Sequence, residues 1–280
     1  CSTTTLSTNS HGCNMFIGCS EATQRQYNRF GDVMIFDTTY KLNRFSMPFA
    51  VFCGVNNHGQ TVVFAGALLR DETRETYIWL FETFLRSVNG RAPGAILTDQ
   101  DKWMSDAIAK VLPSTKHAYC IWHISQKFPM WFSAKLQNSF KSFLANFYDA
   151  IHSESEEEFE RKWRDFVTLF QVQNDTHLQE ILKQKQKIVP CFLRDTFFAD
   201  MTTTQRSESV NALLKRFMNS KVSLTKFLEE FQNCVSQREQ TEKESCMRNR
   251  YLNRTLRTRS PLEREAAQKL TSFALKRFTD

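Results

Sequence analysis

The chain has 280 residues, 41% of them hydrophobic, which is enough to bury a substantial core in one large or two smaller domains. No apolar run approaches the roughly 18 residues that cross a bilayer, and no basic and then apolar leader is visible, so the sequence predicts neither a membrane protein nor an exported one. The 37 basic and 30 acidic residues give a net charge of +7, which is compatible with a polyanionic partner but is also common among proteins without one.

Residues 1–13 are predicted to be a linker fragment. The chain begins with Cys1 in place of Met and its first residues are mostly Ser and Thr, which indicates a piece of a longer protein. The eight cysteines are scattered without the tight spacing of a disulfide framework, so we expect most of them to be reduced, as in an intracellular protein.

Three strands are predicted at residues 33–37, 47–55 and 61–69, where β-branched and aromatic residues are frequent. The last two are separated by NNHGQ, whose Asn-His-Gly is typical of a hairpin turn. The three strands therefore form a β-meander.

Helices and strands then alternate. Apolar residues at helical spacing predict a helix that begins near Thr73 and ends at the Asn-Gly pair 89–90, and a second helix that stops at Pro113. Short strands are predicted at 95–99 (AILTD) and 117–120 (HAYC). The order β-β-β-α-β-α-β is that of a ribonuclease H-like fold, although other open mixed sheets share parts of it.

Everything periodic after this point is helical. The prediction is an α/β protein with a ribonuclease H-like mixed-sheet core, interrupted by an all-helical insertion and followed by further C-terminal helices. A capping box from Ser260 to Glu263 predicts one last helix that runs through Phe273. The predicted regions are the first part of the core at 14–125, the insertion at 126–200, a core helix at 201–220 and a C-terminal helical region at 221–280.

Two of the predicted strands end in an acid, Asp37 in VMIFD and Asp99 in AILTD. In a ribonuclease H-like order these strands lie side by side, so we expect the two carboxylates to be neighbours. At a separation of about 4 Å they would repel by roughly 4 kcal/mol at an effective dielectric of about 20, so the pair makes sense only with a cation between them. Mg²⁺ suits such oxygen ligands.

Glu208 is the candidate for a third acid, because it lies in the first turn of the predicted core helix. Two metal ions held by three acids would activate the attacking oxygen and stabilise the leaving one in phosphodiester chemistry. Each acid also has a structural reading: Asp37 as a turn residue, Asp99 as the approach to the helix that Asp101 caps, and Glu208 as a solvated side chain opposite the apolar stripe. Their order along the chain favours the nuclease-type reading.

Cys120 and His123 have the C-x2-H spacing that lets two side chains reach one metal ion. A zinc site needs four ligands, and no second close pair is visible; His117, Cys191 and His177 are the remaining possibilities. The alternative is a buried cysteine at a strand end and a histidine hydrogen-bonded in the core.

The densest basic stretch is RNRYLNRTLRTR, which contains five arginines and no acid. It has the composition of a segment that follows a phosphate backbone, or of a solvated connector between two helices. The candidate nucleic-acid-binding residues are Arg248, Arg250, Arg254, Arg257 and Arg259.

Several segments together resemble one known family. FGDVMIFDTTYKLNRFSMPFAVFCGVNNHGQ, ALLRDETRETYIWLFETFL, ILTDQDKWMSDAIAKVLPSTKHAYCIWHI and MTTTQRSESVN occur in the order and at the spacing of the transposase-derived domain of plant FAR-RED IMPAIRED RESPONSE proteins, relatives of Mutator-like element transposases. The resemblance extends from about residue 14 to residue 220.

The resemblance implies a ribonuclease H-like core with a helical insertion, an acidic triad at Asp37, Asp99 and Glu208 that binds Mg²⁺ or Mn²⁺ if it is functional, and a C-x2-H motif at Cys120 and His123. It also implies a nuclear, DNA-binding transcription regulator in far-red light signalling that forms homo- or heterodimers with family members. Full-length relatives carry zinc-binding domains on both sides of this region, and neither is visible in the present sequence.

The chain departs from the family pattern before the Phe-Gly-Asp segment. Relatives commonly have an Asn-x-Phe-Trp-x-Asp-like strand there, whereas this chain reads NMFIGC, with Ile17 and Gly18 after the shared Asn14 and Phe16. NMFIGC is therefore a candidate first strand of the core, at the edge of the sheet.

Two functions from different classes follow from the sequence. As a regulator, the chain would be a domesticated scaffold whose acids are vestigial. As an enzyme, it would be the catalytic core of a DNA transposase that cuts phosphodiesters and joins 3′ hydroxyls to target DNA. We expect the regulator, because the family that the chain resembles is predominantly domesticated.

Overall fold

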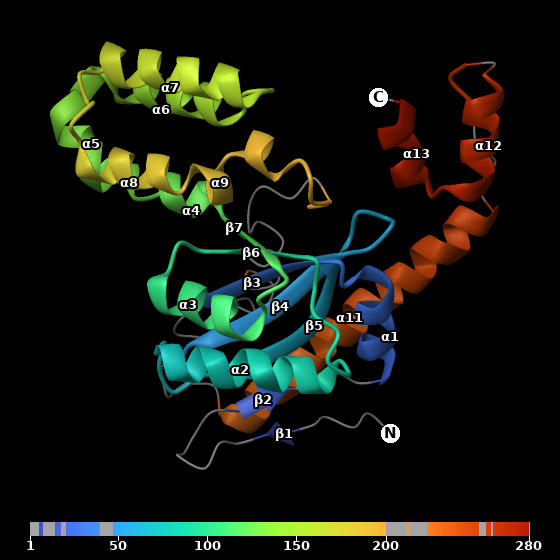
Figure 1. Cartoon of the computed structure of the whole chain (residues 1–280). Coiled ribbons are helices and arrows are strands. Elements are labelled where there is room, and N and C mark those ends of the chain that lie inside the picture. The colour runs from blue at the N-terminus through green and yellow to red at the C-terminus, as the bar shows by residue number, and fades with distance from the viewer. Residues whose placement is uncertain are drawn as a thin grey trace.

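A seven-stranded mixed sheet lies at the centre of the molecule (Figure 1). The computed structural model describes residues 6–7, 15–17, 21–39, 47–199, 212, 223–251, 256–258 and 260–279. Within these residues no helix has the length and apolar character needed to cross a bilayer. In chain order the strands are β1 (Leu6–Ser7), β2 (Met15–Ile17), β3 (Val33–Thr39), β4 (Phe49–Val55), β5 (Thr61–Leu68), β6 (Ala95–Thr98) and β7 (Lys116–Tyr119).

The strand order is β1-β2-β5-β4-β3-β6-β7. Strands β3, β4 and β5 form the predicted antiparallel meander, and β6 and β7 continue the sheet parallel to β3. The turn between β4 and β5 is closed by the buried Asn56, whose Oδ1 accepts hydrogen bonds from the backbone N–H groups of His58 (2.9 Å) and Gln60 (3.0 Å). The candidate strand in NMFIGC is present as β2, which pairs antiparallel with β5. Its predicted place at the edge of the sheet is wrong, because β1 pairs with its other side.

Helices cover both faces of the sheet. One face packs against α1 (Glu21–Phe30), α2 (Arg74–Ser87) and α3 (Lys102–Val111), and the other against the long helix α11 (Leu224–Tyr251), which crosses behind the sheet in Figure 1. Local chemistry fixes two helix starts: the Thr73 hydroxyl accepts from Thr76 N, and the Asp101 carboxylate accepts from Met104 N (2.7 Å). Helix α1 has few apolar residues and was not predicted.

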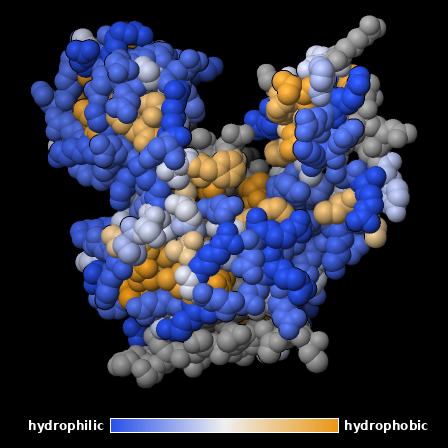
Figure 2. Space-filling model, turned by 45° about the vertical axis from the view of Figure 1, so that its right-hand side comes forward, coloured by the Kyte–Doolittle hydropathy of each residue, from blue (hydrophilic) through white to orange (hydrophobic). Residues whose placement is uncertain are grey.

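A second cluster of helices follows β7 and has a hydrophobic core of its own. Its inner face is rich in buried phenylalanine, including Phe128, Phe143, Phe147 and Phe166. In Figure 1 it projects beyond one end of the sheet, and Figure 2 shows that the surface facing the viewer there is mainly hydrophilic. The elements are α4 (Ile121–Ser125), α5 (Phe128–Leu136), the 3₁₀ turn η1 (Gln137–Ser139), α6 (Phe140–Ile151), α7 (Glu156–Leu169), α8 (Thr176–Lys183), α9 (Lys185–Ile188) and η2 (Pro190–Leu193).

The prediction of a single last helix is wrong. The chain forms α12 (Pro261–Lys269) and α13 (Ser272–Thr279), because Leu270 is extended (φ −90°, ψ 157°) and the Thr271 hydroxyl accepts from Ala274 N (3.2 Å), which starts a new helix.

The predicted capping box also differs from the structure. Ser260 makes no side-chain capping bond, and its N–H donates to Thr258 Oγ1 (3.2 Å). The buried Glu263 carboxylate instead accepts from the N–H groups of Arg257 and Thr258, 2.6 Å each. The Ser260 N–H and the Glu263 carboxylate therefore bond to the segment that precedes α12 instead of to each other.

Candidate metal centre at the ends of β3 and β6

The two acids lie on neighbouring strands. Asp99 directly follows β6, whereas Asp37 lies inside β3, opposite Val51 of β4, so the predicted strand end at Asp37 and its reading as a turn residue are wrong. β3 and β6 are parallel and in register, with Ile35 opposite Leu97, and each of these residues is followed two positions later by an aspartate. Because side chains alternate between faces along an extended chain, Asp37 and Asp99 lie on the same side of the sheet as Ile35 and Leu97, the side that faces α11. Asp37 is only 4% exposed.

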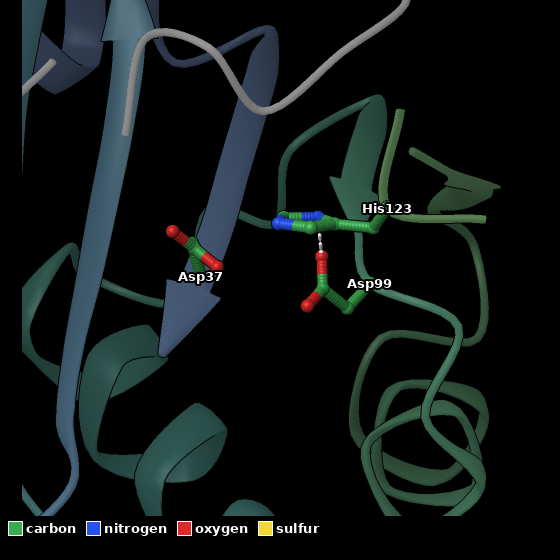
Figure 3. A group of neighbouring side chains, drawn as sticks. All are labelled: Asp37, Asp99 and His123. Atoms are coloured by element: carbon green, nitrogen blue, oxygen red, sulfur yellow. Dashed lines mark ion pairs between the residues drawn. The ribbon is translucent and has the colours of Figure 1, made fainter. Parts of the chain in front are cut away.

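His123 completes the group. Beyond the end of β7, Cys120 N still donates to Thr98 O (2.8 Å), and the chain then turns at once into α4, whose first turn carries His123. The imidazole Nδ1 forms an ion pair with Asp99 Oδ1. One ligand atom each from Asp37, Asp99 and His123 lies within 4.8 Å of the other two, and Figure 3 shows the imidazole extending over Asp99 toward Asp37.

The electrostatics of the group are dominated by His123. Burial by itself would lower the pKa of this imidazole, but contacts with the Asp99 carboxylate and the Cys120 thiol outweigh burial and raise the pKa to about 10. His123 is therefore a cation at neutral pH. It offsets the negative charge of the two aspartates, as a bound metal ion also would.

The other histidines and cysteine considered for a zinc site lie elsewhere. His117 bonds Thr98 Oγ1 through Nε2 (2.8 Å), and its pKa is lowered to about 3 by burial and by Lys187. His177 stacks on Trp131 with ring centroids 4.0 Å apart, and Cys191 is buried in the hydrophobic core of the second helical cluster. The structure thus places His123 with the aspartates. Within the residues it describes, Asp37, Asp99 and His123 are the one set of three potential ligands within reach of each other.

The donors of this group fit a divalent cation. Two carboxylates suit Mg²⁺ or Mn²⁺, and an imidazole nitrogen adds a ligand that transition metals accept more readily than Mg²⁺. Asp37, Asp99 and, once deprotonated, His123 would hold the ion. Cys120 is fully buried beside the imidazole and would support its orientation.

Three of the predicted site residues, Glu208, Arg254 and Arg259, lie outside the described residues. Arg248 and Arg250 are exposed at the end of α11, and Arg257 is exposed just before α12. Sequence reasoning treated His123 and the aspartates as separate sites. The signal that connects them is the parallel arrangement of two strands, one ending in Asp99 and the next followed by C-x2-H.

Known proteins are similar in sequence to this chain both in the sheet region and beyond it. Residues 33–127 match the family described as MULE transposase domain. Over 91% of its length the chain is 38% identical to Protein FAR1-RELATED SEQUENCE 11 of Arabidopsis thaliana, and over 90% it is 37% identical to Protein FAR-RED IMPAIRED RESPONSE 1 of the same plant. These matches cover 38% and 30% of the two relatives, so the chain spans about a third of their length.

Proposed function

This chain belongs to the FAR-RED IMPAIRED RESPONSE related family, and on that premise we propose that it is part of a transposase-derived, DNA-binding transcription regulator of the plant nucleus. The observation that carries the proposal is the 37% identity to FAR-RED IMPAIRED RESPONSE 1, which extends over 90% of this chain, well beyond the MULE match. The name of that relative refers to far-red light, and this supports a role in the light control of development.

The strand order supports a ribonuclease H-like core for this regulator. Three antiparallel strands, β5-β4-β3, are followed by β6 and β7 parallel to β3, with helices on both faces and a helical insertion after β7. Such a core places acids at the ends of β3 and β6 on one side of the sheet, where Asp37 and Asp99 lie. Folds of this kind occur in both enzymes and non-catalytic scaffolds, so the fold alone does not show whether the chain is catalytically active.

DNA contact is proposed for the end of α11 and the segment after it. Arg248, Arg250 and Arg257 are exposed there, and arginines that neutralise phosphates supply affinity that is independent of sequence and sensitive to salt. Tyr251 is 81% exposed beside them and offers an aromatic surface. Dimerisation with family members is part of the proposal and would double this basic surface.

The second candidate is an active Mutator-like transposase, favoured by the convergence of Asp37, Asp99 and His123. A bound Mg²⁺ or Mn²⁺ would supply activation of the attacking oxygen and charge stabilisation of the leaving one. The chain itself would contribute the two carboxylates that hold the ion, with Glu208 proposed as a third. His123, a cation paired with Asp99, favours a scaffold in which the histidine has the charge-balancing role of the metal.

One experiment tests both candidates. Binding of a labelled DNA duplex would be followed by fluorescence anisotropy between about 50 and about 200 mM salt, where we expect affinity to fall steeply. Replacement of Arg248, Arg250 and Arg257 by glutamine should weaken binding and lower the salt slope by about 0.9 for each phosphate that is no longer neutralised. Replacement of Lys141, Arg161 and Arg164, exposed cations of the second helical cluster, removes the same charge and should leave binding unchanged.

The same samples are incubated with Mn²⁺ and examined for strand cleavage. DNA binding without cleavage is the expected outcome for a regulator. Cleavage that disappears in both Asp37→Asn and Asp99→Asn would establish the transposase instead. Equal loss of binding in the two triple variants would remove α11 as the DNA-contacting surface.

A further inference from the structure

The turn between β4 and β5 is fastened to the C-terminal helices by side chains far away in sequence. Gln60 Nε2 donates to Ser245 Oγ on α11 (2.8 Å), and the Thr271 hydroxyl, just before α13, donates to Asn57 O. The buried Asn56 holds the turn from inside. The turn therefore has a fixed position relative to α11.

This arrangement brings a histidine to a cysteine. His58 Nε2 lies 3.3 Å from Cys246 Sγ, although the two residues are 188 positions apart. Cys246 is exposed, whereas the other cysteines that the structure describes, Cys53, Cys120, Cys191 and Cys234, are all buried. A thiol within hydrogen-bond reach of an imidazole and open to solvent meets the two conditions for nucleophilic reactivity.

We propose that Cys246 is a reactive thiol that His58 activates and that forms mixed disulfides with small acidic disulfides such as oxidised glutathione. The proposal does not involve the metal centre, and it shares one residue, Arg250, with the proposed DNA contacts. It assigns a redox-sensitive modification site to the contact between the sheet and α11.

The charge around the thiol favours an anionic reagent. Cys246 lines a groove of about 430 Å³ between α1 and α11. Two acids also line it, and Glu242 accepts a hydrogen bond from Gln26 while burial raises the pKa of Glu239. Cations outnumber these acids, which matches the carboxylates of glutathione; the cationic lining residues are Arg25 and Arg29 on α1 and Lys243 and Arg250 on α11.

His58 is suited to accept the thiol proton. Burial lowers the pKa of His58 below 6.5, Glu242 acts in the opposite direction, and Arg29 lowers it further, so the imidazole is neutral at pH 7. The thiolate attacks one sulfur of the reagent disulfide, a new bond forms from Cys246 Sγ, and the reagent S–S bond breaks. The proton leaves through His58 to the departing thiolate, so one protein thiol is oxidised and one reagent thiol is released.

The test measures alkylation of the whole chain by iodoacetamide, which is neutral, with each cysteine followed by peptide mass spectrometry. We expect Cys246 to react fastest among the described cysteines, and His58→Gln to slow it at pH 7 by about fivefold or more, because the group that accepts the thiol proton is removed. Above about pH 9, where a free thiol ionises by itself, the two rates should converge. His152→Gln, in the second helical cluster, is the matched control and should change nothing.

The reagent preference is tested in the same way with oxidised glutathione. Arg25→Gln combined with Arg250→Gln should slow mixed-disulfide formation severalfold and leave the iodoacetamide rate unchanged, while Cys246→Ser should abolish the adduct at this position. Equal iodoacetamide rates for the wild type and His58→Gln at pH 7 would overturn activation by histidine. An arginine variant that slows both reagents, or neither, would overturn the assignment of an acidic disulfide.

Discussion

At the scale of single residues, the notable feature is a positively charged histidine, His123, beside two aspartates. Asp37, two residues before the end of β3, and Asp99, just after β6, lie on adjacent parallel strands, and His123 forms an ion pair with Asp99. The buried Asp37 has little water to solvate it, so the positive charge of His123 contributes to the stability of this end of the sheet. The fold and the candidate metal centre are therefore coupled.

Stability should depend on pH through His123. Its folded pKa is raised from 6.5 to about 10, so its contribution is fully present below pH 6.5 and is lost as pH rises toward about 10. With a chelator present, denaturant unfolding should show a decline in the free energy of unfolding over this window in the wild type. His123→Gln should be less stable at pH 6.5 by about 1–3 kcal/mol and should lack the His123-dependent part of the decline.

The Asp99→Asn variant provides the matched control. It removes the same ion pair, so the double variant should be little less stable than either single variant, as expected for two partners in one interaction. Additive losses in the double variant would show that His123 and Asp99 act independently.

At the scale of elements, a glycine determines how closely α11 approaches the sheet. A Cβ on Gly66 in β5 would lie 2.8 Å from the ring of Phe231 and 2.9 Å from that of Phe49. Phe231 and Phe49 are themselves in edge contact, with ring centroids 5.4 Å apart. The close packing of α11 against the sheet thus requires a residue without a side chain at position 66.

Gly66→Ala should destabilise the chain by about 1–3 kcal/mol, because the added methyl group cannot fit without moving two aromatic rings. In a Phe231→Ala background, where one of the two rings is gone, the same substitution should cost much less. Thermal unfolding of the four proteins of this cycle measures the coupling. A cost that is the same in both backgrounds would place the strain elsewhere in β5.

Elements that depend on local chemistry were predictable from sequence. The presence and order of β3, β4 and β5 follow from runs of β-forming residues, and the caps at Thr73 and Asp101 from capping side chains, although β3 continues two residues past its predicted end at Asp37. The break between α12 and α13 was not predictable, because Thr271 there bonds Asn57 O, 214 residues away. The pairing of His123 with Asp99 likewise depends on the register of β6 and β7, which no short stretch of sequence contains.

At the scale of the whole molecule, the described residues form a sheet core, with one hydrophobic cluster on each face, and a second, all-helical core. The helices that cover the sheet pack against its two faces and form the first core. The helices from α4 to α9 bury a cluster of their own next to β7 (Figure 1). Tyr119 at the end of β7 belongs to the second cluster, so the two cores meet where the candidate metal centre lies. A perturbation of one core should reach the other mainly through this junction.

Phe147→Ala tests this separation. The ring is fully buried and lies 4.7 Å, between centroids, from Phe128, so its removal should cost about 3–5 kcal/mol. Because this ring packs within the second cluster, hydrogen exchange should accelerate in α5 to α8 and change little in β3, β4 and α2. Phe52→Ala, in the sheet core, should show the reverse pattern. Uniform acceleration in both variants would mean that the two cores unfold as one cooperative unit, and the insertion would then be an integral part of the sheet domain.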